Sequence, residues 1–299
     1  DMSSRVMSIL SKFTPNIEIY SIDEAFLKFE GFENYDLKSY CQEIKEMVLK
    51  WTGIPISIGI APTKALEKVA NRIVKKFPER TNEVYIIDSC KKKKNALKWL
   101  KIEDVWGIGF RHAKRLRNIK INTAYDFINL EDSWVRKNMS VVGLRLKKEL
   151  EGKSVLDLEE VRSPKKAIAT TRSFKSTIST FSNLEERITT YTLLGAEKLR
   201  KQRSCASAIY VFVRSNPFQK EAEQYRNGCT VTLPYSTDSS LILNQYALKG
   251  LKSIFRSGIE YKKAGILLLG LTPSISRQMS LFEKDSAKHS VLMQTLDKI

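Results

Sequence analysis

The spacing between apolar residues changes several times in the first part of the chain, and each change predicts a new element of secondary structure. Stretches of helical spacing alternate with short runs that have the character of buried strands. The expected elements, in order, are a helix over 5–13, strands over 17–22 and 25–29, a helix over 36–51, a strand over 56–61 and a helix over 63–77. This order predicts a mixed sheet covered by helices for residues 1–88.

The next part, residues 89–160, reads as helical and basic. Between Lys91 and Lys120 there are eleven Lys or Arg residues and two acidic ones. A Gly107-Ile108-Gly109 turn separates two helical stretches. Such a turn leaves backbone N–H groups free at the start of a helix, where they bind phosphate without reading sequence. With the basic residues that follow, the turn resembles a helix-hairpin-helix, a motif that contacts nucleic acid.

A polar linker over 161–166 leads to a third part, 167–271, whose pattern repeats itself. The expected elements are a strand over 167–174, a helix over 183–202, strands over 206–214 and 229–235, a helix over 238–257 and a strand over 263–271. They suffice for one four-stranded sheet with two helices on one face. The final residues, 272–299, are polar and are expected to form an extended or weakly helical tail.

Charge narrows the class of partner. Lys and Arg total 51 against 33 Asp and Glu, a formal net charge of +18 among 299 residues. This excess favours a polyanion, and the longest apolar runs are far shorter than the ~20 residues that span a bilayer. The cysteines are scattered without CxxC spacing and there are two histidines, so neither a zinc site nor His-based acid–base catalysis is expected.

Adjacent carboxylates, Asp23 and Glu24, interrupt the apolar strands over 17–22 and 25–29. A bare Asp-Glu pair is most often only the turn of a hairpin. Carboxylates in an apolar setting are costly unless they are neutralised, and divalent cations do this where phosphate chemistry takes place. The surrounding sequence favours the second interpretation.

That surrounding sequence, Tyr20 to Leu27 (YSIDEAFL), resembles the metal-binding motif of Y-family translesion DNA polymerases, and Ile56 to Asn71 (ISIGIAPTKALEKVAN) resembles the family's next block. Thr170 to Phe174 and Glu197 to Arg200 resemble the UmuC branch, the catalytic subunit of bacterial DNA polymerase V. The resemblance implies an α+β multidomain fold: a partial palm over 1–88, a helical thumb over 89–160 and a little finger over 167–271.

The resemblance also implies a set of site residues. Asp23 and Glu24 would be catalytic and would bind two Mg²⁺ ions, and Lys64 would contact the triphosphate of the incoming nucleotide. The implied DNA-binding residues are Gly107, Gly109, Arg111, Lys114, Arg115, Arg172 and Lys175. Gln278, Met279, Leu281 and Phe282, within the tail, resemble the peptide that docks bacterial polymerases on the sliding clamp.

The family implies error-prone synthesis across damaged DNA in the SOS response, in the bacterial cytoplasm at the nucleoid. Its implied partners are primer–template DNA, deoxynucleoside triphosphate, the sliding clamp, the processed UmuD dimer and RecA. The family's early Asp and its fingers have no counterpart here, so we expect a fragment that does not extend a primer by itself. Two alternatives stay open: a DNA polymerase IV-type member, and a non-catalytic, clamp-tethered DNA-binding repair scaffold.

Overall fold

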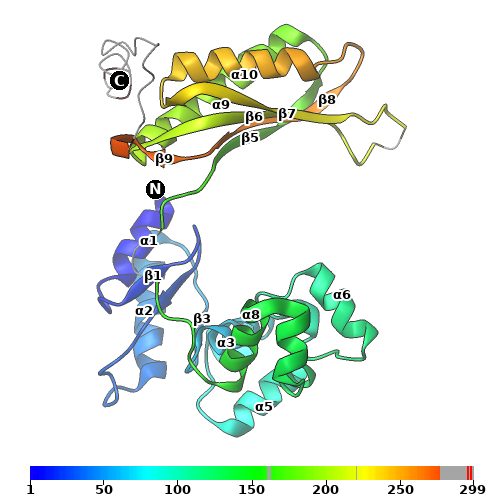
Figure 1. Cartoon of the computed structure of the whole chain (residues 1–299). Helices are drawn as coiled ribbons and strands as arrows, with labels where there is room; N and C mark the ends of the chain where they lie inside the picture. Colours follow the sequence, from blue (N-terminus) through cyan, green and yellow to red (C-terminus); the bar gives the residue numbers. More distant parts are fainter. Residues whose placement is uncertain (160–162, 220, 277–294, 296, 298–299) are drawn as a thin grey trace. The chain divides into compact units, whose positions relative to one another are not determined.

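The computed structural model describes residues 1–159, 163–219, 221–276, 295 and 297 (Figure 1). The chain divides into two units, Asp1–Arg162 (unit 1) and Ser163–Ile299 (unit 2), and each unit is described by itself. The boundary between the units falls within the linker expected over 161–166.

Unit 1 contains short strands and many helices. Its elements are α1 (Met2–Leu10), β1 (Ile17–Ile19), β2 (Ala25–Leu27), α2 (Leu37–Thr52), β3 (Ile58–Ile60), α3 (Lys64–Lys76), α4 (Pro78–Thr81), β4 (Val84–Ile86), α5 (Cys90–Trp99), a 3-10 helix (Ile102–Asp104), α6 (Phe110–Asn118), α7 (Ala124–Ile128) and α8 (Asp132–Glu151). The helices expected over 36–51 and 63–77 therefore form nearly as the periodicity predicts. The first helix begins and ends three residues earlier than expected.

The expectation of one mixed sheet in this part needs correction. Within the described residues, β1 pairs with β2 in antiparallel register and β3 pairs with β4 in parallel register, so unit 1 has two separate two-stranded sheets. The strands are three residues long rather than five or six, because the carboxylate turn ends β1 early and β3 begins only at Ile58. Apolar runs predict where strands form but not which strands pair.

Close approach of a strand to a helix shapes the centre of unit 1. A Cβ atom at Gly59, in the middle of β3, would lie 2.5 Å from both the backbone N of Asn71 and the backbone O of Glu67 in α3. Only glycine allows backbone atoms to approach so closely. Gly59 therefore fixes the distance between β3 and α3, and with it the position of every side chain that α3 carries.

One hydrophobic core joins α3 to the helices beyond it. Leu66, Val69 and Ala70 of α3 are buried in the same cluster as Leu97 of α5 and Leu150 of α8. This cluster spans the boundary expected between residues 88 and 89. A second cluster lies between α1 and α2 and includes Val84 of β4.

Unit 2 is a sheet covered by two helices on one face. Its elements are β5 (Ile168–Ile178), α9 (Phe181–Lys201), β6 (Ser204–Ser215), β7 (Arg226–Thr237), α10 (Ser240–Ile254), β8 (Tyr261–Leu269), β9 (Thr272–Pro273) and a 3-10 helix (Ser274–Ser276). The strand order is β5-β8-β6-β7, and β9 pairs with the start of β6. Figure 1 shows α9 and α10 together above the sheet.

The predicted elements of this unit all form, and most of them are longer than expected. Alternating side chains of β6 (Ile209, Val211 and Val213) are fully buried beneath the helices, together with Ala264, Ile266 and Leu268 of β8. The sheet has five strands rather than four, since the first two residues of the expected tail add β9. No helix among the described residues has the length and apolar character to cross a membrane.

We predict that Gly59→Ala destabilises unit 1. The added methyl group would meet backbone atoms of α3, which cannot move aside without displacing the helix. We therefore expect the free energy of unfolding to fall by about 1–3 kcal/mol or more. Gly109→Ala is the matched control, because a Cβ there meets nothing within 4 Å and the backbone φ is −77°. Urea melts of the two variants measure the difference, and equal midpoints would contradict this account.

Candidate active site

The carboxylate pair lies in the tight connection between β1 and β2. The backbone N–H groups of Tyr20 and Ser21 both donate to the carbonyl of Glu24, which closes the turn. Asp23 and Glu24 are thus outside the regular strands, where successive side chains would point to opposite faces. The turn leaves Asp23 exposed and Glu24 half-buried.

Hydrogen bonding and nearby cations keep Asp23 ionised. The Ser21 hydroxyl donates to Oδ1 of Asp23 at 2.5 Å. This bond is the main cause that lowers the pKa of Asp23 from its ordinary value, and the charges of Lys75 and Lys68 lower the pKa further. An ionised, exposed carboxylate is the oxygen ligand that Mg²⁺ prefers.

Two lysines of α3 have different partners. Lys64 forms an ion pair with the buried Glu18 and donates to the backbone carbonyl of Asp157 at 2.6 Å. Lys68 lies one helical turn further on, with its Nζ 3.3 Å from Oε1 of Glu24. The structure therefore brings Lys68, and not Lys64, to the carboxylate pair.

Three aromatic rings hold this region together. Tyr20, Phe26 and Trp106 contact one another edge to face, with ring centroids 5.6–6.1 Å apart. The indole N–H of Trp106 donates to the hydroxyl of Tyr20 at 3.2 Å. Lys68 Nζ lies 4.5 Å from the Phe26 ring centroid and 5.2 Å from that of Tyr20, so cation–π attraction fixes the lysine beside Glu24.

Trp106 also connects the carboxylate turn to the Gly-x-Gly turn. Gly107 follows it directly with φ +85°, in the left-handed region, and Gly109 is the N-cap of α6 with no side-chain capping bond. Arg111 and Lys114 are exposed on α6. Arg115 is exposed too, but one of its N–H groups donates to the carbonyl of Asn138 at 2.8 Å.

A buried carboxylate anchors the N-terminus of α3. Glu149 of α8 is fully buried and accepts from the backbone N of Ala65 at 3.3 Å and from that of Val155 at 2.7 Å. Its own carbonyl accepts from the Thr63 hydroxyl at 2.7 Å. A negative charge is favourable at a helix N-terminus, so this interaction fixes where α3 and its lysines begin.

The donor set fits a hard cation in part. Two carboxylates sit at an exposed turn, and such oxygen ligands suit Mg²⁺, which usually keeps waters and substrate phosphates as its remaining ligands. Among the described residues, no group of three or more His, Cys, Asp and Glu side chains could hold a metal ion.

In unit 2, the predicted DNA-binding residues lie on β5. Arg172 pairs across the sheet with the buried Ala264, so it lies on the face covered by the helices. Burial raises the pKa of Tyr191 of α9, and the charge of Arg172 acts in the opposite direction on that pKa. Lys175 is exposed where the register of β5 with β8 shifts, and its carbonyl accepts from Lys262. The expected clamp-binding residues, Gln278, Met279, Leu281 and Phe282, lie outside the described residues.

Reasoning from the sequence missed the roles of Lys68 and Trp106. The spacing of Lys68, four residues after Lys64 and seven before Lys75, places the three lysines on one stripe of the helix and could have indicated a shared role. Trp106 directly precedes the Gly107–Gly109 turn, but nothing in the sequence pattern shows that it contacts a hairpin 86 residues earlier.

Comparison with known proteins shows which class of protein this chain resembles. Residues 1–72 match the model of the impB/mucB/samB family, and residues 165–281 match that of the impB/mucB/samB family C-terminal domain. The solved Y-family polymerase chimera of Dbh and Dpo4 shares the fold, with a TM-score of 0.65 at 20% identity over 90% of this chain and 75% of that one. The insertion ternary complex of Dbh DNA polymerase gives 0.51 at the same identity, over 89% and 74%. The fold is that of these Y-family DNA polymerases.

Curated relatives narrow the class to one branch. UmuC of Salmonella typhimurium (strain LT2) is 36% identical over the whole of this chain and 72% of its own length, and ImpB of the same species is 34% identical over the whole of this chain and 71% of its own length. DNA polymerase IV of Clostridium acetobutylicum is 24% identical over 99% of this chain and 72% of its own length. The chain belongs to the impB/mucB/samB (UmuC) family of translesion DNA polymerases. The expected family is confirmed, and the non-catalytic scaffold is not favoured.

The half-buried Glu67 of α3, whose Oε2 atom is buried, provides a pH-dependent test of the packing around this site. Burial is the main cause that raises its pKa from 4.5 to about 7, and its Oε2 atom has no hydrogen-bond partner among the described residues. The folded protein therefore binds more protons than the unfolded chain between these two values. The stability that protonation provides is fully present below pH 4.5 and is lost as the pH rises through about 7.

We predict that Glu67→Gln removes this dependence and stabilises unit 1 at pH 8. The gain relative to the unmodified protein should approach about 3 kcal/mol at pH 8 and should vanish near pH 4.5. Glu79→Gln, at an exposed position of α4, is the control and should leave the pH profile unchanged. Thermal melts from pH 4.5 to pH 8 provide the measurement, and parallel profiles for all three proteins would refute the assignment.

Proposed function

We propose that unit 1 carries part of the nucleotidyl-transfer site of a translesion polymerase, and that its two parts correspond to a partial palm (1–88) and a thumb (89–160). The observation that carries this proposal is the Tyr20–Phe26–Trp106 cluster. It joins the carboxylate turn, the lysine beside it and the Gly-x-Gly turn in one unit. Metal ligands, a phosphate-binding cation and a DNA-backbone contact are the parts that primer extension needs close together.

Asp23 and Glu24 would hold the Mg²⁺ ions of this site. Such ions activate the attacking hydroxyl and neutralise the charge of the triphosphate. Asp23 suits this role because it is exposed and ionised, and Ser21 holds its carboxylate in one orientation. Glu24 would exchange its ion pair with Lys68 for a metal when nucleotide binds. Lys68, released from Glu24, would then contact the phosphates.

Lys64 is the residue that the family resemblance implies for triphosphate binding, and the distances favour Lys68 instead. Lys64 is held by Glu18 and the carbonyl of Asp157, and Glu18 also accepts from the backbone N of Glu159 at 2.8 Å. A lysine with these partners stabilises the segment after α8. Lys68 has one carboxylate partner and two ring faces, which leave its charge directed at the candidate metal site.

We predict that replacing Lys68 and replacing Lys64 change different properties of the polymerase. In a polymerase of the relatives' full length that contains this chain, Lys68→Ala should raise the KM for nucleotide by about tenfold or more, since a charge-assisted contact to phosphate is lost. Lys64→Ala should instead lower the melting temperature and leave KM nearly unchanged. Asp23→Asn and Glu24→Gln should abolish primer extension with Mg²⁺. Full activity of either carboxylate variant would exclude the metal site.

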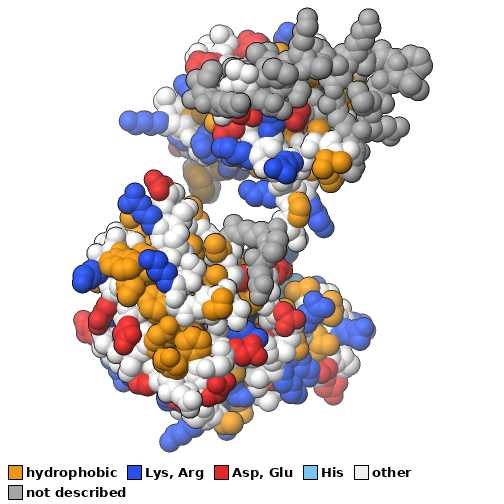
Figure 2. Space-filling model, turned by 90° about the vertical axis from the view of Figure 1, so that its left-hand side faces the viewer, with side chains coloured by type: hydrophobic (Ala, Val, Ile, Leu, Met, Phe, Trp, Pro, Cys, Tyr) orange, Lys and Arg blue, Asp and Glu red, His pale blue; other side chains and the backbone are white. Residues whose placement is uncertain are grey.

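We further propose that unit 2 is the little finger and that both units bind primer–template DNA through phosphates. Figure 2 shows Lys and Arg side chains on each unit, interspersed on both with Asp and Glu. In unit 1 the described contacts leave Arg111 and Lys114 exposed at the turn where α6 begins. Binding of this kind weakens steeply with salt and shows little preference for sequence.

The sliding clamp is the proposed partner of residues 278–282, and the processed UmuD dimer and RecA are the other partners that the family implies. Within unit 2, described residues on either side of this segment form contacts near the end of α9. The backbone N of Ser274 donates to the carbonyl of Arg203, and Asp297 forms a two-point ion pair with Arg200 at 2.5 and 2.6 Å. Three apolar side chains in a polar stretch suit a pocket on a partner.

We predict that Leu281→Ala with Phe282→Ala removes binding to the bacterial sliding clamp. The expected affinity of the unmodified chain is modest, on the order of micromolar, because a short peptide makes a small interface. Val291→Ala with Leu292→Ala changes two apolar residues of the same tail and serves as the control. Surface plasmon resonance on immobilised clamp measures both variants. Unchanged clamp binding with a melting temperature several degrees lower would show a structural role instead.

A further inference from the structure

A segment of unit 1 without helix or strand is attached to the rest of the unit through its backbone. Residues 155–159 follow α8 and its C-cap Gly152, and none of their side chains is buried. A stretch that buries so little apolar surface is expected to open easily. Four of its five residues nevertheless have a backbone group bonded to a charged side chain. The segment is therefore held by hydrogen bonds and not by burial of its own side chains.

The first attachment is a carboxylate inside unit 1. Glu149 is fully buried, and its Oε1 atom accepts from the backbone N–H groups of Val155 at 2.7 Å and Leu156 at 3.0 Å. A buried carboxylate is costly unless hydrogen bonds satisfy it. The segment supplies donors that Glu149 needs, and the same bonds hold the segment in place.

The second attachment is an ion pair. The side chains of Glu18 and Lys64 are only 9% and 12% exposed. Lys64 donates to the carbonyl of Asp157 at 2.6 Å, and Glu18 Oε2 accepts from the N–H of Glu159 at 2.8 Å. Release of the segment would therefore break two hydrogen bonds to charged groups, which are stronger than bonds between neutral groups.

The connecting chain is attached again where unit 2 begins. Gln202, the C-cap of α9, accepts from the N–H of Lys165 and donates to the carbonyl of Lys165, both at 3.0 Å. Five residues separate Glu159 from Lys165. The six peptide units between these two residues extend by at most about 22 Å. Without the attachments at Glu18 and Gln202, eleven peptide units would be free between Asp157 and Ile168, and they could extend by about 40 Å.

We propose that Glu18 and Gln202 are positioning residues that shorten the tether between two DNA-binding units. The inference rests on the proposed function, in which both units bind primer–template DNA. When one unit is bound, the tether sets the effective concentration of the other, and this concentration falls roughly as the −3/2 power of tether length. Lengthening the tether from about six to about eleven peptide units should therefore weaken binding about 2.5-fold.

Amide hydrogen exchange of the 299-residue chain tests the two attachments directly. The N–H groups of Glu159 and Lys165 should be protected in the unmodified chain. Glu18→Ala should speed exchange at Glu159 by about tenfold, because a hydrogen bond to a charged group is lost. Gln202→Ala should speed exchange at Lys165 and leave Glu159 protected.

Duplex binding, followed by anisotropy, tests whether the attachments act through tether length. Glu18→Ala with Gln202→Ala should raise the Kd about two- to threefold, and a Gly-Ser stretch of about 20 residues inserted after Arg162 should raise it about ninefold. In the chain with the insertion, the two substitutions should raise the Kd by less than about 1.5-fold, because the tether is already long. Damage to the fold would instead weaken binding by the same factor in both chains.

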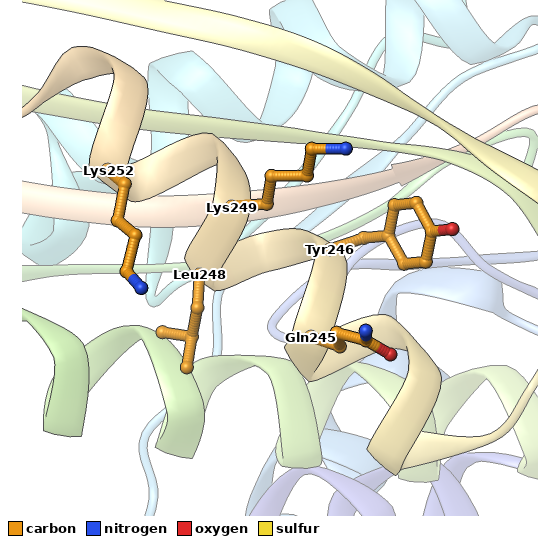
Figure 3. Close-up of a pocket in the computed structure, with 5 residues that line it drawn as sticks. All are labelled: Gln245, Tyr246, Leu248, Lys249 and Lys252. Carbon is orange, nitrogen blue, oxygen red and sulfur yellow. The ribbon is translucent and has the colours of Figure 1, made fainter.

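Matched controls remove the same chemical groups from exposed positions. Glu46→Ala lies on α2, and Gln245→Ala lies on α10 (Figure 3). Both should leave the exchange rates and the Kd unchanged. If Glu18→Ala does not fold, Gln202→Ala alone frees about nine peptide units and should raise the Kd about twofold.

Each outcome supports or overturns the proposal. Fast exchange at Glu159 and Lys165 in the unmodified chain would overturn it, as would an insertion that leaves the Kd unchanged or lowers it. Equal weakening by the substitutions with and without the insertion would show a purely structural role and would also refute it. Failure of the unmodified chain to bind duplex would instead contradict the proposed function, and the exchange rates would still decide whether the attachments exist.

Discussion

The contact between β3 and α3 is the constraint on which the candidate active site depends. Gly59 lets the strand approach backbone atoms of the helix, and Glu149 holds the helix N-terminus through buried hydrogen bonds. Lys68 then follows at a fixed distance along α3 and meets Glu24. A chain with a larger residue at position 59 would shift the helix and separate the lysine from the carboxylate, although every residue of the site would still be present.

Two pairs of basic side chains, one in each unit, differ in whether they have acidic partners. In unit 1, Lys64 and Lys68 are largely shielded from solvent and each has a carboxylate partner, so their charges are held in place by the fold. On the sheet of unit 2, Arg214 of β6 lies directly across from Arg226 of β7. Neither has an acidic partner in an ion pair among the described residues. The first arrangement positions a cation for a small charged ligand. The second leaves repulsion that an extended polyanion would relieve.

Much of the fold could be predicted from periodicity. The helix α3 shows a strong apolar stripe, and the strand–helix alternation of unit 2 is strong enough to predict each of its main elements. Pairing was less predictable: β1–β2 and β3–β4 form separate sheets where one mixed sheet was expected. Arg172 is on the helix-covered face because of its register with Ala264, and register depends on partners that are distant in the sequence.

The sequence by itself determined the family and the local chemistry: the Asp23-Glu24 pair, the Gly107–Gly109 turn and the excess of basic residues are contiguous or compositional features. The tertiary structure alone decided which side chains meet. Lys68 reaches Glu24, and Trp106 reaches Tyr20 across 86 residues, because core packing brings distant segments together. Local residue patterns record the preferences of neighbours in the chain, whereas a site is built from neighbours in space, and these follow from packing that no short stretch of sequence encodes.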